Sequence, residues 1–341
     1  MHGMMRPGGV CLALVLLLAA AAPAGAQDQE EIGVWKKEVK LALNILQSSY
    51  SNNWNGGDKG SVTWTGNVDA FLEKSFSERT NWRNTLKLAY GQSHQQERAS
   101  DGSLYWPRPD KTDDLIDFES LFRMTPRSGW DPFAAFNFES KFEDLSDPSG
   151  RSLSLNPMTF KESAGVSRVL VKSDERELML RLGMAYIQNS RKFYPDPLPD
   201  QTLQRENSTE VAGEMVANYK AKVLDGRVGW ESKLVLTLPF SWSGKSIFED
   251  GGFTTDSPLP EDVASYTTAL DADWENTFTA NITKVISVKL YMRWVYDKYD
   301  NTVKPVVEDG ALVNEADVHQ AIRKAGQFKQ TLALGFGYTF N

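Results

Sequence analysis

The chain has 341 residues, of which 24% are charged and 41% hydrophobic, and its formal net charge is −8. An acidic chain lacks the surplus of Lys and Arg that phosphate contacts need, so no nucleic-acid partner is expected. Its 10 Trp, 11 Tyr and 17 Phe exclude a disordered chain, which buries little apolar surface. The mean hydropathy of −0.42 is typical of a soluble protein, but it averages over residues that a strand separates onto two faces.

The beginning of the chain has the pattern of a secretory signal peptide. Arg6 supplies a positive charge, and an apolar run extends over Val10–Ala22. Ala24-Gly25-Ala26 then places small residues where signal peptidase cleaves, and the run is too short to span a membrane. We therefore expect a signal peptide over 1–26 and a single exported domain over 27–341.

Twelve segments of the remaining chain alternate apolar and polar residues with the period of two that is typical of β-strands. In one of them Ile286, Val288 and Leu290 share an apolar face, while Ser287 and Lys289 lie on the other. Helical spacing would scatter these residues around the surface. In chain order the expected strands are 35–46, 62–76, 82–92, 116–124, 134–142, 158–170, 177–188, 211–223, 228–242, 266–278, 285–296 and 328–340.

Long and short connections alternate between these strands without exception. A transmembrane barrel keeps short turns at one end and long loops at the other, whereas a soluble sandwich has no reason to do so. The sequence therefore predicts an all-β fold, a 12-stranded antiparallel β-barrel of the outer-membrane type with an up-and-down meander. The even strand number places both termini in the periplasm of a Gram-negative bacterium. Pro239 cannot donate to a strand ladder, so we expect a break in the ladder or a bulge there at the rim.

Aromatic residues recur near both ends of the expected strands, as interfacial girdles do. Trp82, Trp130 and Trp230 lie near the short turns, and Trp64 and Trp242 lie near the long loops. This placement predicts two belts at the membrane surfaces.

The end of the chain has aromatic residues two apart, at Phe336, Tyr338 and Phe340. The pattern resembles the C-terminal signal read by the outer-membrane assembly machinery, except that Asn341 follows the last aromatic. We therefore expect that machinery, together with outer-membrane lipids, as partners.

Three segments carry a family resemblance: the opening strand Trp35–Ile45, the loop Asn52–Gly57 and the stretch Trp274–Thr277. Together they resemble a bacterial outer-membrane family, of Bacteroidetes type, known only as a domain of unknown function. The resemblance covers most of the exported chain and implies the barrel fold, but it brings no activity, ligand or catalytic residue. The loop residues favour turns with positive φ, or with Asp58 they hold Ca²⁺ through oxygen ligands.

With the apolar faces toward lipid, the polar faces of the strands point into the lumen. Acids and bases are nearly balanced there, which favours pairing across strands over selectivity for one sign of charge. Twelve strands predict a lumen narrower than that of a porin. The lumen is then either a path for a small polar solute or a brace of paired charges. The candidate lumen-lining residues are Asp69, Glu73, Arg83, Lys87, Asp117, Glu119, Arg123, Glu139, Lys141, Arg181, Glu214, Lys220, Glu231, Lys233, Asp271, Asp273, Glu275, Lys289 and Arg293.

Three of these acids share one face of one strand. Asp271, Asp273 and Glu275 repel each other unless they are countered, and Lys289 and Arg293 on the next strand are the expected counter-charges. The alternative is a cation site in the lumen.

The sequence offers no serine and histidine in an arrangement that predicts a catalytic site. Ser93 and His94 are sequence neighbours, so on a strand they point to opposite faces, and His319 lies in a long loop. We therefore expect no catalytic site, no metal and no cofactor. The expected function is a narrow pore or transporter for a small polar solute. The alternatives are a non-conducting structural or surface-interaction barrel and, third, an outer-membrane lipid hydrolase.

Overall fold

The computed structural model describes residues 32–49, 59–101, 103–125, 129–195, 199, 202–283, 285–323 and 325–340. The expected signal peptide over 1–26 and the loop Asn52–Gly57 with Asp58 lie outside these ranges.

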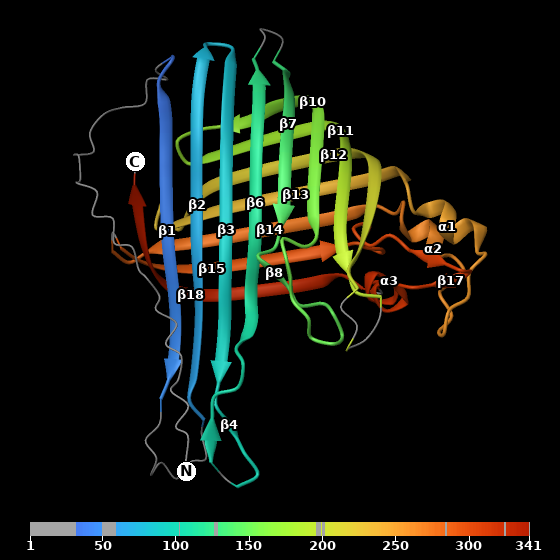
Figure 1. Ribbon diagram of the computed structural model, residues 1–341. Helices are drawn as coiled ribbons and strands as arrows, with labels where there is room; N and C mark the ends of the chain where they lie inside the picture. The colour runs from blue at the N-terminus through green and yellow to red at the C-terminus, as the bar shows by residue number, and fades with distance from the viewer. Residues whose placement is uncertain are drawn as a thin grey trace. The chain divides into compact units, whose positions relative to one another are not determined.

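Twelve antiparallel strands close into a barrel (Figure 1). Each barrel strand pairs with the next along the chain, and β1 closes the barrel on β18 between the pairs Val39–Phe340 and Asn44–Gly335. The predicted 12-stranded up-and-down barrel of the outer-membrane type is confirmed. Its strands are β1 (Trp35–Ser48), β2 (Ser61–Ser77), β3 (Thr80–Gln95), β6 (Asp110–Met124), β7 (Asp131–Ser140), β10 (Met158–Lys172), β11 (Arg176–Phe193), β12 (Gln204–Val223), β13 (Val228–Trp242), β14 (Asp271–Asn281), β15 (Ile286–Tyr296) and β18 (Gln327–Phe340).

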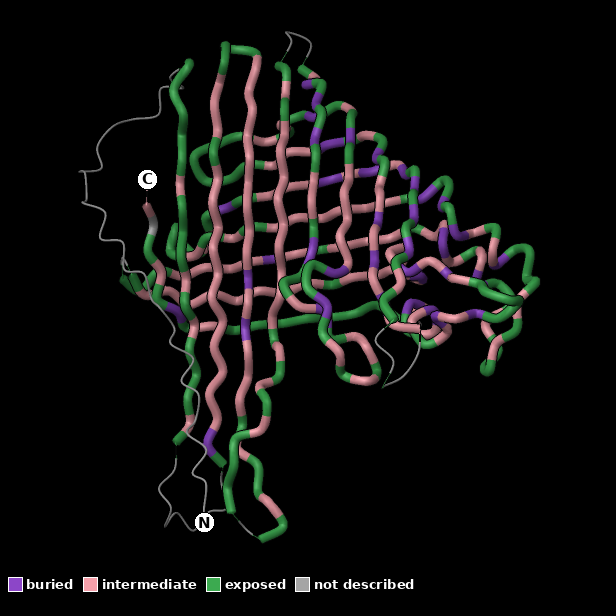
Figure 2. Tube along the Cα trace, in the orientation of Figure 1, coloured by how far each residue is buried: buried purple, intermediate pink, exposed green. Residues whose placement is uncertain are grey.

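The apolar faces of the strands point outward. Leu332 and Phe336 on β18 are 70% and 61% exposed, and Ile45 on β1 is 54% exposed. Large apolar side chains repeated at this exposure form far more apolar surface than a water-soluble monomer tolerates, so a bilayer must cover them. Figure 2 shows that buried positions gather instead on β7, β10, β11 and β12 and among the loops at one end. In the described segments, none of the helices is both long and apolar enough to span a bilayer.

Residues with small side chains let the closing strands approach each other. Gly335 on β18 lies opposite Asn44 on β1, and a Cβ at Gly335 would overlap the side-chain oxygen of Asn44. A side chain at position 335 would therefore displace the Asn44 side chain at this seam, which is the shortest of the strand pairings in the barrel.

The predicted bulge at Pro239 is confirmed, and it reverses the alternation beyond it. Val211 pairs with Ser241 whereas the next residue, Ala212, pairs with Pro239. The extra residue turns Trp242 inward, where it is only 4% exposed. Its assignment to the aromatic girdle at the long-loop end is therefore wrong.

Two long connections, 243–270 and 297–323, fold together at the end of the barrel that carries the long loops. We call this unit the loop cap. In its core, Trp242 and Phe248 stack on each other and each meets Tyr299 in a T-shaped contact, and Val318 belongs to the same cluster. Tyr266 lies in the cap, so the strand expected over 266–278 begins only at Asp271. The cap holds α1 (Lys245–Asp250), α2 (Val263–Tyr266), α3 (Glu315–Ala321) and the hairpin of β16 (Val307–Glu308) and β17 (Ala311–Leu312).

Two further hairpins stand in other long connections. They are β4 (Glu97–Arg98) with β5 (Leu104–Tyr105), and β8 (Glu143–Asp144) with β9 (Leu153–Ser154). Long connections thus carry all the additional structure, while the barrel strands meet at short turns at the opposite end.

Candidate functional site: a charged lumen under a loop cap

Charges of opposite sign line one wall of the lumen in a row. Asp69 on β2, Lys87 on β3, Asp117 on β6 and Glu139 on β7 are successive register partners. Lys87 thus lies between two acids on neighbouring strands, which is a stabilising cross-strand arrangement.

A second row lies four residues along the same strands. Glu73 is the register partner of Arg83, and its Oε1 accepts a hydrogen bond of 2.8 Å from Nδ2 of Asn81. The Arg83 guanidinium lies 5.0 Å from the centroid of the Phe71 ring. These contacts hold both charged side chains against the wall of the barrel.

Among the described residues, two ion pairs connect barrel strands that are separated by two or more other strands. Arg181 on β11 lies 2.5 Å from Oε1 of Glu119 on β6, although β7 and β10 separate the two strands. Lys329 on β18 lies 2.9 Å from Oδ1 of Asp113 on β6, with β1, β2 and β3 between them. Side chains can make such contacts only if the lumen is narrow, because they form chords across the inner curve of the barrel.

A single arginine counters the acids of β14. The guanidinium of Arg293 donates two hydrogen bonds, of 2.9 and 2.6 Å, to Asp273 and lies 3.8 Å from Glu275. Lys289 is the register partner of Thr279, four residues along β14 from Glu275, and Asp271 lies at the cap end of β14. The structure thus shows the pairing alternative for two of the three acids. Among the described residues, no group of three or more His, Cys, Asp or Glu could hold a metal ion.

The middle of the lumen holds an interlinked set of charges from opposite walls. Lys233 on β13 interacts with both Glu119 and Glu139, which lie on β6 and β7. Glu214 on β12 pairs with Lys161 on β10. Lys161 was not among the predicted lumen-lining residues because its strand has the weakest alternation of apolar and polar residues of the twelve.

Several candidate residues lie away from this set. Lys220 and Glu231 form a pair of 3.6 Å near the short turns, and their side chains are 58% and 66% exposed. Arg123 lies 3.9 Å from Asp131 at the same end. Lys141 follows the last residue of β7 and is exposed, so its assignment to the lumen wall is wrong.

Polar contacts attach the loop cap to lumen-facing residues. Arg191 on β11 pairs with Glu206 on β12 at 3.2 Å and with Asp317 on α3 at 2.9 Å. The backbone oxygen of Asn301 accepts a hydrogen bond of 2.8 Å from the Ser208 hydroxyl. These contacts hold the cap against the inner face of β11 and β12 at this end. Arg191, Glu206 and Ser208 were not predicted to face the lumen because β11 and β12 extend beyond the alternating segments from which the strands were predicted.

An arginine near the end of the second cap connection pairs with two acids near its start. Arg323 lies 2.7 Å from Asp297 and 2.8 Å from Asp300. Burial, reinforced by the neighbouring Asp300, raises the pKa of the Asp297 carboxyl to about 7 even though Arg323 opposes the shift. The protonation of this carboxyl therefore changes near neutral pH.

The residues considered for catalysis make separate contacts. The Ser93 hydroxyl lies 2.9 Å from that of Thr63, whereas His94 contacts the backbone oxygen of Pro107 on the other face of the strand. His319 lies 3.3 Å from Glu315 in the cap. None of these contacts joins a serine to a histidine.

Fold and lumen together define a transmembrane β-barrel protein of the outer-membrane type. Residues 45–144 match the model of a family described as "Protein of unknown function (DUF3078)". The match confirms the predicted resemblance to a family of unknown function. It includes the loop Asn52–Gly57 but not Trp274–Thr277, so it is narrower than the resemblance suggested. No curated protein sequence matches the chain.

Similar solved structures are also barrels. An outer membrane channel from Pseudomonas putida F1 is 10% identical, with a TM-score of 0.40, and the match covers 94% of this chain and 100% of that one. The beta domain of the Bordetella autotransporter BrkA is 6% identical, with a TM-score of 0.31 and coverages of 89% and 97%. The translocator domain of the autotransporter NalP from Neisseria meningitidis is 7% identical, with a TM-score of 0.35 and coverages of 89% and 88%.

Proposed function

We propose that this protein is a narrow channel of the bacterial outer membrane that passes a small polar solute. The observation that carries the proposal is the pair of ion bridges that span two or three intervening strands, Arg181–Glu119 and Lys329–Asp113. They place charges of both signs close together inside the lumen. Such a lining offers hydrogen-bond donors and acceptors to a polar solute and gives no net preference for one sign of charge.

The loop cap sets the second condition for passage in this proposal. Because Arg191 and Asn301 attach it to lumen-facing residues, a solute entering from the long-loop end must pass beside or displace it. The cap would then limit the size of the solute, while the ion bridges would select for polarity.

The proposed location follows from the outer surface. Apolar side chains cover the barrel between its ends, and a closed barrel is the β-structure that satisfies its backbone within a bilayer. We place the start of β1 and the end of β18 on the periplasmic side, because they share the end that carries the short turns. Outer-membrane lipids contact the apolar faces, and the assembly machinery reads β18 through Phe336, Tyr338 and Phe340.

Liposome swelling tests the channel. Liposomes with the purified barrel are diluted into an isosmotic solution of a pentose, an amino acid or a dextran. We expect swelling with the two small solutes and none with the dextran, and faster swelling when Arg181→Met and Glu119→Gln are combined. No swelling with any solute, for barrels that still show heat-modifiable gel migration, would favour the alternative of a non-conducting structural or surface-interaction barrel.

A further inference from the structure

The membrane-facing side of the barrel carries a groove across β7 and β10. Its floor is made by Ala134 and Ala164, which are register partners on the two strands. Phe122 on β6 and Met184 on β11 flank this floor in the same row, and they are 39% and 50% exposed. The small floor between larger walls leaves a hollow of about 600 Å³ that opens toward the membrane.

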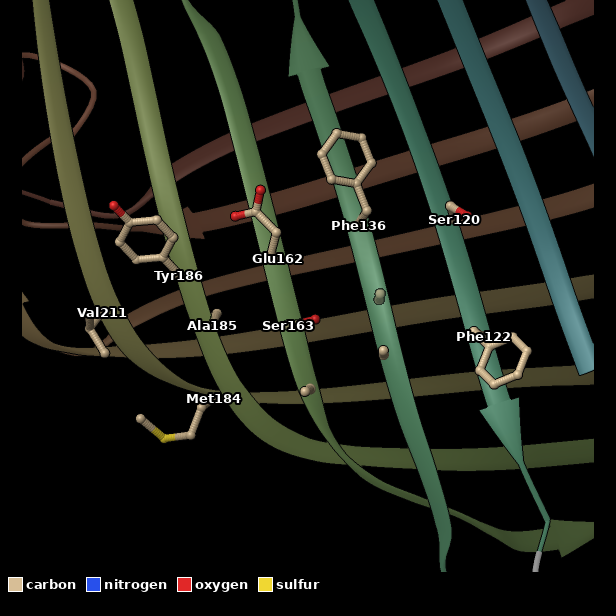
Figure 3. A pocket seen from close by; sticks show the side chains of 12 residues that line it. Ser120, Phe122, Phe136, Glu162, Ser163, Met184, Ala185, Tyr186 and Val211 are labelled. Carbon is tan, nitrogen blue, oxygen red and sulfur yellow. The ribbon is translucent and has the colours of Figure 1, made fainter. Parts of the chain in front are cut away.

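One end of the groove is polar. In the next row, Glu162 on β10 lies between Phe136 and Tyr186 (Figure 3). Its carboxylate accepts hydrogen bonds of 3.2 and 3.3 Å from Nε2 of Gln188. Glu162 is the charged residue of the groove lining, and its side chain is exposed on the outer face. Tyr186, which is 43% exposed on the outer face, is an aromatic residue of the kind that gathers where the bilayer becomes polar.

The Glu162 carboxylate carries a negative charge at the polar end of an apolar groove, and none of the residues that line the groove is cationic. It is stabilised when a cation or a strong donor approaches it, and Gln188 supplies only an amide. The occupant that matches both ends is amphipathic: a hydrocarbon chain for the alanine floor and a positive group for Glu162.

We propose that this groove binds one membrane lipid with a primary-amine headgroup. The acyl chain lies over Ala134 and Ala164, and the ammonium group donates to the Glu162 carboxylate. A lipid with an anionic headgroup would place its charge against Glu162 and is disfavoured. The site is independent of the proposed channel, because it lies on the outer face and the ion bridges lie within.

Native mass spectrometry of the full barrel tests the site. The protein is released from vesicles of phosphatidylethanolamine or of phosphatidylglycerol, and bound lipid is counted. We expect one retained phosphatidylethanolamine and at least tenfold less retained phosphatidylglycerol. The substitution Glu162→Gln, which keeps the shape of the side chain, should bring the two lipids to within twofold of each other.

A second variant tests the groove itself. Ala164→Phe fills the floor and should abolish retention, whereas Ala70→Phe, on the outward face of β2, is the matched control and should retain lipid as the wild type does. Heat-modifiable migration verifies that both variants fold. Equal retention by the wild type and both alanine variants would overturn the proposal. So would a barrel dimer that Ala164→Phe disrupts, because a second copy would then occupy the groove.

Discussion

The ion bridge between Arg181 and Glu119 should contribute measurably to the stability of the barrel. Its side chains are 8% and 22% exposed, so replacing Arg181 by Met leaves the Glu119 carboxylate in the lumen without its nearest partner. Breaking a buried pair in this way costs about 3–5 kcal/mol. Because Lys233 and Lys161 still attract Glu119, we expect the lower end, about 3 kcal/mol.

A double-mutant cycle isolates the bridge itself. Arg181→Met, Glu119→Gln and the double variant are unfolded by urea in detergent micelles and followed by tryptophan fluorescence. We expect a coupling energy of about 2 kcal/mol between the two positions. The exposed pair Lys220–Glu231 is the matched control and should couple by less than about 1 kcal/mol. A coupling at 181 and 119 no larger than the control would refute the assignment of a bridge across the lumen.

Three further predictions concern the cap and the seam. Trp242→Ala should remove the centre of the cap core at a cost of about 3–5 kcal/mol, seen as faster proteolysis within 243–270 while the barrel keeps its heat-modifiable migration. Because the pKa of Asp297 is about 7 in the folded cap and about 3.9 in an unfolded chain, the folded cap holds a proton that the unfolded chain has lost, and its stability falls as pH rises through 7. Proteolysis of the cap should therefore be faster at pH 8 than at pH 6. If the Asp297→Asn variant shows the same difference in proteolysis rate between the two pH values as the wild type, this explanation is contradicted. Gly335→Val should crowd Asn44 and lower the yield of folded barrel, whereas a normal yield would contradict the close approach.

The strands were predictable because the bilayer imposes a simple rule on them. Every second residue must be apolar, so the period of two marks all twelve strands in the sequence. The assignment of side chains to the lumen or to lipid fails where a strand ends or where a bulge interrupts the alternation. Lys141 was assigned to the lumen although β7 ends one residue earlier, and Trp242 was assigned to lipid although the bulge at Pro239 turns it inward.

The contacts inside the lumen were predictable only in kind. The balance of charges predicts that they pair, but the partners of Arg181 and Lys329 depend on the curvature of the closed barrel, which brings distant strands together. Lys161 escaped because the apolar face of its strand is interrupted by Glu162. The loop cap escaped because its helices are short and are held by a shared core around Tyr299 rather than by a periodic pattern.

Single-channel recording in planar bilayers tests the central claim most directly. A narrow lumen crossed by ion bridges should give small conductance steps for the wild type, and larger steps of similar charge selectivity when Arg181→Met and Glu119→Gln are combined. The exposed pair at Lys220 and Glu231, replaced by Met and Gln, should leave the steps unchanged. If folded wild-type and variant barrels insert but carry no current at any voltage, the lumen is not a path, and the account of this protein as a channel is contradicted.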